Sequence, residues 1–486
     1  MEKYLAIDQG TTSSRAIIFD SNLEPIADFQ QEYSLSYPQD GWVEANPNEI
    51  LKTVNNSIEN VLDQISEKIA SCGITNQRET TVVWSKETGE TVYPAIIWQD
   101  RRTDDLCKSL KAKGHEEMVK QKTGLVLAPY FSATKIQWIL DNVPNARKRA
   151  ESGELLFGTI DSFLIFNLSK QKNHMTDVTN ASRTMLFNIN DMCWDKDLLE
   201  LFNIPFSMMP KIAPCDGEFG NLIFNDININ GVIGDQQSAL VGQHCINYGD
   251  MKSTYGTGCF LMVNTKEKIV RSEDGLLTTV AYKLNNETNY ALEGSIYSCG
   301  NIIQWLRDKM EFFESAKESE LLINLNGESG NVHFLPAFNG LGAPYWNSDV
   351  RGGFQGITQN SDKKDFVTAA FKSICYQTKD IIESLNNKNI FINDLLVDGG
   401  MTSNNTFCQL LSDSLGIDIS KPSNIEPTAL GACVVSQISA GVSLKEIRNK
   451  LDKKFISNEA NSSFYMHDYN AWKDYVESSI GSLKDK

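Results

Sequence analysis

The sequence has no two cysteines in a CxxC arrangement, only five histidines, and no apolar run approaching the roughly 20 residues that span a bilayer. Its ten cysteines stand singly, so the sequence predicts neither a zinc site nor a disulfide framework. The isolated histidines give no sign of a Ser-His-Asp triad. The N-terminus has no basic and apolar leader. We therefore expect a cytoplasmic protein without membrane insertion.

Positive charge is also scarce. The 62 acidic residues outnumber the 45 lysines and arginines, and the formal net charge is −17. This charge opposes binding to nucleic acid and to anionic membranes, so we expect no nucleic-acid partner. Any anionic ligand must be held by local donors. At 486 residues the chain is too long for one ordinary core, which favours two domains of roughly 240 residues.

One pattern occurs twice in the chain. Residues 4–19 run from an apolar strand through Gly10-Thr11-Thr12 into a second strand, and residues 252–263 do the same around Gly256-Thr257-Gly258. A Gly-Thr turn exposes backbone N–H groups with hydroxyls beside them, which suits the binding of phosphate. The two turns predict two related domains that hold one polyphosphate between them.

Strand and helix signals alternate along the sequence. Helices are predicted after the Asn46-Pro47 cap, from Asp365, and from residue 403 or 404 to residue 415, where Gly416 ends the helix. Aromatic and apolar residues between 465 and 480 predict a packing helix. Buried strands are predicted at residues 155–157, 232–233, 332–335 and 395–397. This alternation indicates an α/β fold.

No Pro- or Ser-rich linker separates the two halves. We place the boundary at residues 243–250, just before the second Gly-Thr turn, which gives domains 1–244 and 245–486. We expect secondary structure to join the two domains and to act as their hinge.

Three aspartates follow apolar strands: Asp8, Asp235 and Asp398. Because ligands of α/β sheets gather beyond the carboxyl ends of strands, these residues are expected to converge. Asp8 is a candidate Mg²⁺ ligand beside phosphates, or else a turn-initiating residue. Asp235 is a candidate base that orients an attacking hydroxyl, or else a helix N-cap. Asp398 and the glycines after it suit a flat ligand such as adenine, or else form only a tight turn.

Two segments fit a small polyol. Arg78 and Glu79 follow the predicted strand of residues 69–74, and a donor beside an acceptor satisfies a vicinal diol. The alternative for this pair is a structural ion pair. Trp98 follows apolar residues 95–97 and offers an aromatic face to carbon atoms, or else belongs to the core.

The motifs at residues 8–15, 76–80, 98–103, 234–237 and 255–260 resemble the FGGY family of carbohydrate kinases, and within it the members that act on glycerol. Residues 130–138 and 352–357 are similar to the two signature stretches of that family. The resemblance implies two actin-like, ribonuclease H-type ATPase domains with a cleft between them, closing over ATP, Mg²⁺ and glycerol. It also implies a homodimer or homotetramer, since relatives often assemble in this way.

The resemblance implies a role for each matching residue. The reaction would be direct in-line phosphorylation of glycerol to sn-glycerol 3-phosphate, the first step of glycerol catabolism, with Asp235 as general base. Asp8 and Asp235 are the candidate metal ligands. Glycerol would be held by Arg78, Glu79, Trp98, Tyr130, Asp235, Gln236 and Phe260. The nucleotide would be held by Thr11, Thr12, Ser13, Arg15, Thr257, Gly300, Gln304, Gly400 and Asn404.

Two alternatives stay open from the sequence. One is an FGGY kinase for another substrate such as xylulose, gluconate or ribulose, although the segments around Arg78 and Trp98 resemble the glycerol version. The other is a catalytically silent sensor, against which the intact Asp8 and Asp235 argue. Some bacterial relatives respond to fructose 1,6-bisphosphate through an arginine-containing stretch, or to phosphorylation of a histidine. Residues 211–218 contain no arginine and Asn190 replaces the histidine, so we expect weak or absent control by either route.

Overall fold

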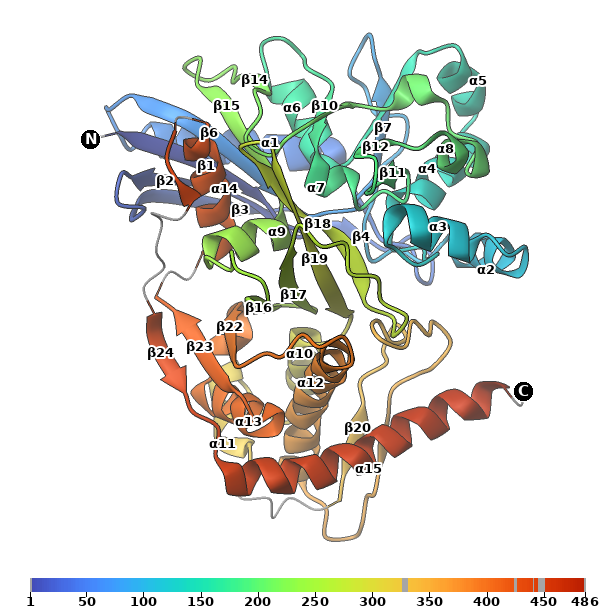
Figure 1. The fold of residues 1–486 in the computed structure, drawn as a ribbon, viewed down its shortest axis with the longest axis vertical. Helices are drawn as coiled ribbons and strands as arrows, with labels where there is room; N and C mark the ends of the chain where they lie inside the picture. The colour runs from blue at the N-terminus through green and yellow to red at the C-terminus, as the bar shows by residue number, and fades with distance from the viewer. Residues whose placement is uncertain (1, 326–330, 424–425, 440, 445–450, 485–486) are drawn as a thin grey trace.

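The computed structural model describes residues 2–325, 331–423, 426–439, 441–444 and 451–484. Two mixed sheets organise it, one in each half of the molecule (Figure 1). The first sheet has the strand order β14 (Gly220–Asn221), β15 (Asn228–Gly234), β6 (Ile69–Asn76), β1 (Lys3–Gln9), β2 (Ser13–Asp20) and β3 (Pro25–Glu32). The second has the order β18 (Leu277–Leu284), β19 (Glu287–Ile296), β17 (Cys259–Lys266), β16 (Met251–Tyr255), β22 (Asp394–Asp398), β23 (Asp418–Pro422) and β24 (Leu451–Phe455).

The centres of the two sheets are built to the same plan. β1 pairs antiparallel with β2 and parallel with β6, while β16 pairs antiparallel with β17 and parallel with β22. β15 then continues parallel beside β6, as β23 does beside β22. The pattern that occurs twice in the sequence therefore forms the central hairpin of each sheet.

Shorter strands and the helices surround these sheets. The short strand pairings are β4 (Leu35–Ser36) and β8 (Ala95–Ile96) with β5 (Glu44–Ala45), β7 (Val82–Ser85) with β9 (Leu155–Gly158), β10 (Met175–Asp177) with β13 (Lys211–Ala213), β11 (Phe187–Asn188) with β12 (Cys193–Trp194), and β20 (His333–Leu335) with β21 (Gly353–Gln355). Helices before the second hairpin are α1 (Pro47–Leu62), α2 (Asp104–Ala112), α3 (Glu116–Thr123), α4 (Ser132–Asn142), α5 (Ala146–Glu151), α6 (Ile160–Leu168), α7 (Val178–Ala181), α8 (Lys196–Leu201) and α9 (Asp235–Gly242). Those after it are α10 (Gly300–Asp308), α11 (Ala316–Leu322), α12 (Lys363–Asn386), α13 (Asn405–Leu415), α14 (Pro427–Ile438) and α15 (Glu459–Lys484).

Most predicted helices are confirmed, with differences at their ends. The side chain of Asn46 caps α1, and α13 runs from the Asn404 cap to Gly416, whose φ of 72° is left-handed. The helix predicted from Asp365 begins two residues earlier as α12, because the side chains of Asp362 and Asp365 form a capping box. The strand predicted at residues 332–335 is β20, which among the described strands pairs with β21 and lies outside the two large sheets.

Helix α14 comes late in the chain but packs in the first half, beside β6 and β1 (Figure 1). The contact depends on glycine. A Cβ on Gly73 of β6 would lie 2.0 Å from the carbonyl oxygen of Ala432, and a Cβ on Gly242 of α9 would lie 2.0 Å from that of Pro427. The segment that connects helix α9 to strand β16 comprises residues 243–250, where the boundary was predicted. The division into domains 1–244 and 245–486 stays a prediction.

Helix α15 packs along the second half, as Figure 1 shows at the bottom of the view. Its buried side chains are Tyr465, Tyr469, Trp472 and Val476, and they belong to the core of that half. The predicted packing helix is therefore confirmed. Among the described helices, none combines the length and the apolar character that a membrane crossing requires.

Candidate active site

The first Gly-Thr turn joins β1 to β2. Gly10 N–H donates to the carbonyl of Ser13 at 2.8 Å, and the hydroxyl of Thr11 accepts from the indole N–H of Trp98 at 2.9 Å. Arg15, on β2, forms ion pairs with Asp28 at 3.0 Å and with Glu426, the residue before α14. The first turn is thus fixed by contacts to the aromatic residue on one side and to α14 on the other.

The second turn joins β16 to β17 and supports the start of α10. Gly256 N–H donates to the carbonyl of Gly258 at 2.9 Å, and its own carbonyl accepts from the N–H of Gly300 at 2.9 Å. A Cβ on Gly300 would lie 2.5 Å from that carbonyl oxygen. Only glycine therefore permits this approach of helix to turn.

A cavity of about 590 Å³ opens beside the second turn. It is lined by five of the predicted nucleotide residues, namely Thr257, Gly300, Gln304, Gly400 and Asn404. Asn404 caps α13 with its side-chain oxygen, while its amide nitrogen Nδ2 is buried and has no hydrogen-bond partner among the described residues. An unpaired donor of this kind fits a ligand acceptor. The other predicted nucleotide residues, Thr11, Thr12, Ser13 and Arg15, lie at the first turn and do not line this cavity.

Arg78 lies at the centre of a buried charge cluster. Its Nε is 3.0 Å from Oδ1 of Asp235, and its two terminal nitrogens donate to the carboxylate of Glu293 at 2.5 and 3.1 Å. The Nη1 group also donates to Gln237 at 3.1 Å. A guanidinium has five N–H bonds. Within the described residues, these contacts leave one Nη2 N–H of Arg78 uncommitted.

Glu79 presents the matching acceptor. Its Oε1 accepts from Nε of Arg183 at 2.6 Å, and no contact is formed by Oε2 within the described part of the chain. Glu79 has a φ of 61°, a left-handed backbone conformation that is strained for a residue with a side chain. Such strain is typical of functional sites. Arg78 thus has a spare donor and Glu79 a spare acceptor among the described residues, and the two side chains approach each other to 4.0 Å between Nε and Oε1. A vicinal diol needs one donor and one acceptor of this kind.

Asp235 and Asp8 influence each other electrostatically. Burial raises the pKa of Asp8 to about 7, and the charge of Asp235 contributes to that rise. Burial also raises the pKa of Asp235, while Arg78 opposes the shift. Asp235 is the first residue of α9 and Gly234 is its N-cap, so the alternative N-cap role is wrong. The helix begins at Asp235 itself, and Oδ1 of Asp235 accepts from the backbone N–H of Gln236 at 2.7 Å.

The carboxylates of Asp8 and Asp235 fit a divalent cation. Two nearby ionised carboxylates repel each other, and a cation between them would relieve that repulsion. No group of three or more His, Cys, Asp or Glu that could hold a metal occurs in the described ranges. A Mg²⁺ ion at this position would complete its shell with phosphate oxygens and water, which is its usual behaviour.

Lys252 links the predicted residues Gln236 and Asp398. Its buried ammonium donates to the side-chain oxygen of Gln236 and to the hydroxyl of Thr254, which donates in turn to Asp398 at 3.0 Å. Burial lowers the pKa of Lys252, with the charge of Asp398 opposing. Burial raises the pKa of Asp398 to about 6. The three strand-end aspartates therefore belong to one connected region.

Three predicted aromatic residues form a wall beside the charge cluster. The ring centroid of Trp98 is 5.6 Å from that of Phe260 and 5.8 Å from that of Tyr130. The guanidinium carbon of Arg78 lies 6.0 Å from the Phe260 ring. The structure thus brings the predicted substrate residues Arg78, Glu79, Trp98, Tyr130, Asp235, Gln236 and Phe260 into one neighbourhood.

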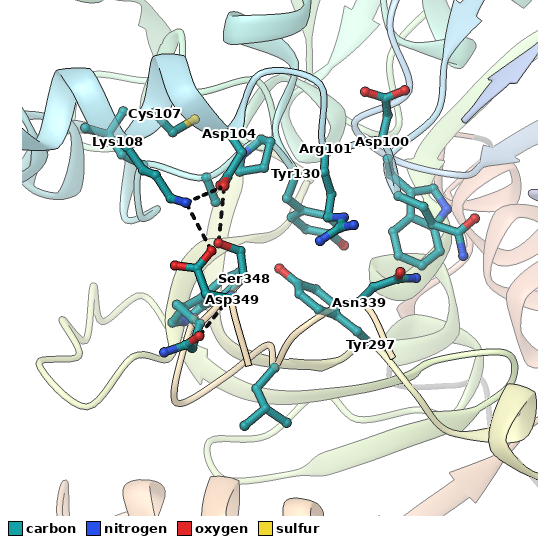
Figure 2. A pocket seen from close by; sticks show the side chains of 18 of the residues that line it. Asp100, Arg101, Asp104, Cys107, Lys108, Tyr130, Tyr297, Asn339, Ser348 and Asp349 are labelled. Carbon is teal, nitrogen blue, oxygen red and sulfur yellow. Dashed lines mark hydrogen bonds and ion pairs between the residues drawn. The ribbon is translucent and has the colours of Figure 1, made fainter. Parts of the chain in front are cut away.

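A second cavity of about 220 Å³ opens beside Trp98 and Tyr130. Figure 2 shows the side chains of Tyr130 and Arg101 from the first half and Tyr297 from the second pointing toward one another across it. At its edge, Lys108 lies 3.1 Å from Asp104 and 3.1 Å from Asp349. This cavity is therefore bounded by both halves of the chain.

Sequence reasoning missed three charged residues of this region: Arg183, Glu293 and Lys252. Glu293 had the clearest signal, because a lone carboxylate stands among the mostly uncharged residues 290–296. Lys252 similarly opens the second hairpin. Arg183 had no local signal.

The sequence matches the FGGY family of carbohydrate kinases twice, its N-terminal domain over residues 3–242 and its C-terminal domain over residues 251–440. The chain is 49% identical to glycerol kinase 1 of Pseudomonas aeruginosa over 447 residues, covering 90% of each protein. It is 46% identical to a glycerol kinase of Oceanobacillus iheyensis over 491 residues, covering 98% of each.

Solved structures give the same picture. Plasmodium falciparum glycerol kinase with ADP superposes with a TM-score of 0.89 at 35% identity, covering 99% of this chain and 98% of that one. A xylulose kinase of Lactobacillus acidophilus superposes with a TM-score of 0.90 at 20% identity over all of both chains, which bears on the fold alone. These superpositions confirm the predicted two-domain α/β fold.

Proposed function

We propose that this chain, which belongs to the FGGY family of carbohydrate kinases, phosphorylates glycerol with ATP to give sn-glycerol 3-phosphate. The proposal is carried by Asp235, whose carboxylate lies beside Arg78 and close to Asp8 of the first turn. Identity to glycerol kinases over most of the chain supports glycerol as the acceptor. This reaction is the first step of glycerol catabolism.

Glycerol is held through its hydroxyls and its carbons separately. The uncommitted N–H of Arg78 donates to one hydroxyl, and Oε2 of Glu79 accepts from it or its neighbour. Trp98 and Phe260 cover the carbon atoms, while Tyr130 and Gln236 supply further polar contacts. A site that pairs with each hydroxyl rejects analogues that lack one, because buried polar groups would be left unpaired.

Asp235 acts as the general base. Its carboxylate orients a primary hydroxyl of glycerol and accepts the proton as the oxygen attacks the γ-phosphorus in line. The new O–P bond forms while the bond from the γ-phosphorus to the bridging oxygen breaks, and ADP leaves with that oxygen. Little basicity is needed, since the transition state is loose and the proton moves late. The raised pKa of Asp235 nevertheless favours proton transfer.

The nucleotide occupies the larger cavity, and its phosphates extend toward both Gly-Thr turns. Thr257, Gly300, Gln304, Gly400 and Asn404 line the nucleoside and second-turn side. Thr11, Thr12, Ser13 and Arg15 serve the phosphates from the first turn. Asp8 and Asp235 would hold Mg²⁺, which when bound supplies charge neutralisation on the phosphate oxygens.

We further propose that the protein works in the cytoplasm as a homodimer or homotetramer. Light scattering coupled to size-exclusion chromatography measures the assembly directly.

We also propose that fructose 1,6-bisphosphate inhibits weakly or not at all, since residues 211–218 lack arginine. Clear inhibition at physiological concentration would contradict this. In place of a regulatory histidine, Asn190 accepts a hydrogen bond from Arg271 at 2.8 Å.

The decisive experiment is ADP release measured with and without glycerol. Glycerol-dependent ADP release supports the proposed activity, whereas its absence in a folded, ATP-binding protein would favour the silent sensor. A substrate panel of glycerol, xylulose, gluconate and ribulose then tests the acceptor. A higher kcat/KM for any of the sugars than for glycerol would reassign the substrate.

A further inference from the structure

Four ionised side chains form a closed ring beside Asp235. Glu293 accepts from the guanidinium of Arg78 and also from Nη2 of Arg183 at 2.8 Å. Arg183 donates to Glu79, and Glu79 lies 4.0 Å from Nε of Arg78. No member of the ring is more than 2% exposed. The ring joins the two residues proposed to bind the glycerol diol to two residues without an assigned role.

We propose that Glu293 and Arg183 are positioning residues for glycerol, with Glu293 orienting Arg78 and Arg183 orienting Glu79. This inference rests on the proposed function, because it takes Arg78 and Glu79 as the diol-binding pair. It adds the source of their geometry, which includes a residue from the second half of the chain.

Glu293 fixes the plane of the Arg78 guanidinium. Two parallel N–H···O bonds to one carboxylate define both the position and the orientation of the fork. Arg78 has an alternative carboxylate within reach, since its Nε already lies 3.0 Å from Asp235. Without Glu293, the terminal nitrogens of Arg78 would turn toward Asp235. Glu293 therefore keeps the base available to the substrate hydroxyl.

The balance of charges in the ring also keeps the free oxygen of Glu79 available to the substrate. Two arginines face two glutamates, so each buried charge has a partner. If Glu293 lost its charge, both guanidinium groups would compete for Glu79 and draw its free oxygen away from the substrate. The ring is not arranged for stability alone, because the buried Nη1 of Arg183 has no hydrogen-bond partner among the described residues.

Glu293 also makes the glycerol site depend on both halves of the molecule. It lies on β19 of the second sheet, where the hydroxyl of Ser295 donates to its Oε1 at 3.0 Å, whereas the other three ring members precede the second hairpin. The diol-binding pair is therefore held in place only while β19 is docked against the first half.

The test compares E293Q, E293D and R183K with the wild-type protein, each in its full-length form with ATP and Mg²⁺. E293Q should raise the KM for glycerol by on the order of 10- to 100-fold, because misplacing substrate-orienting groups by about 1 Å has effects of this size. The KM for ATP should stay within about threefold, since the nucleotide cavity is separate. E293D, which keeps the charge, should recover part of the glycerol affinity.

The matched control is D380N. Asp380 is a buried carboxylate of α12 that accepts from Tyr345 and Tyr469 and lies outside the active site. D380N should lower the melting temperature and leave both KM values unchanged. A glycerol-selective rise in KM for the ring variants, absent in D380N, supports the positioning role.

Three results would overturn the inference: folded ring variants with the wild-type KM for glycerol, parallel rises in the KM for glycerol and for ATP, or failure of all three ring variants to fold. Each of these assigns Glu293 and Arg183 a structural role only. The wild-type protein tests the proposed function separately. If it shows no glycerol-dependent ADP release, the proposed function fails, whereas normal wild-type activity with unaffected ring variants removes this inference alone.

Discussion

The glycerol region and the nucleotide cavity differ in the source of their polar groups. The former is built from ionised side chains, namely Arg78, Glu79, Arg183, Asp235 and Glu293, most of them buried. The latter has three glycines on its wall, Gly256, Gly300 and Gly400, and its charged residues, Arg307, Lys317 and Glu320, are not fully buried. A small neutral polyol offers few contacts, so each must be strong. A nucleotide offers a large surface and phosphates that backbone N–H groups can serve.

This difference predicts that the glycerol region and the nucleotide cavity respond differently to substitutions. Substitutions in the glycerol region should act through charge and orientation, even when they conserve volume. Substitutions at the nucleotide cavity should act through volume, because an added Cβ either strikes backbone or takes space from the ligand. The following experiments probe this contrast, in order of decreasing expected effect.

The isosteric change D235N should lower kcat by roughly 100-fold or more, the usual scale for a positioned general base. Volume is conserved, so the loss would come from charge alone. Steady-state kinetics with coupled ADP detection measure it, and isothermal titration checks that glycerol still binds. Turnover near that of the wild type would remove Asp235 from its proposed role.

Gly300→Ala adds a Cβ that would lie 2.5 Å from the carbonyl oxygen of Gly256, so the second turn must shift. We expect the KM for ATP to rise by about 10-fold or more and the free energy of unfolding to fall by about 1 to 3 kcal/mol, as in other overpacked sites. The KM for glycerol should change much less. Steady-state kinetics and urea unfolding measure these effects. Equal rises in the KM for ATP and in the KM for glycerol would contradict the proposed difference between the two sites.

D8N tests the electrostatics of the first turn. The pKa of Asp8 is raised to about 7 in the folded protein. A raised folded-state pKa means that stability is fully present below the unfolded value, near 3.8, and is lost as the pH rises toward 7. The stability of the variant relative to the wild type should therefore rise between pH 4 and pH 8, by at most about 4 kcal/mol.

The measurement for D8N is urea unfolding without Mg²⁺ or nucleotide, because a bound cation would offset the repulsion. A pH-independent difference between D8N and the wild type would contradict the electrostatic account of this turn.

Gly400→Ala is the matched partner of Gly300→Ala. A Cβ on Gly400 meets no atom within 4 Å, so the free energy of unfolding should stay within about 0.5 kcal/mol of the wild type. The added methyl group faces the cavity and should raise the KM for ATP by only about 3- to 5-fold, the scale of about 1 kcal/mol. An unchanged KM would place the nucleotide away from Gly400.

The exposed ion pair of Lys108 with Asp349 should matter least. It crosses between the halves at the edge of the smaller cavity, and the two side chains are 50% and 63% exposed. Exposed pairs contribute at most about 1 kcal/mol, so K108M should change the KM for glycerol by no more than about threefold. D349N should match it, and both effects should shrink at high salt. A larger change would mean that this contact controls closure.

Short-range features of the fold were predictable. The Gly-Thr hairpins, the cap at Asn404 and the terminator Gly416 depend on residues within a few positions of each other. Thr257 and Gly400 were predicted from turn signals in the sequence, whereas Gly300 was assigned only through the family resemblance. Contacts between distant helices were not predictable: the ammonium of Lys372 lies 3.1 Å from Asp468 and ties α12 to α15.

The sequence by itself determined the two hairpins, the alternation of strands and helices, and the residue types at the strand ends, because each follows from local conformational preference and the period of apolar residues. The tertiary structure alone decided that Glu293 holds Arg78 across 215 positions and that α14 returns to the first sheet. The sequence of a charged residue's neighbours does not specify its distant partner, and a glycine in the sequence does not indicate which helix will pack against it. Those choices arise only when the whole chain packs and buried charges must be paired.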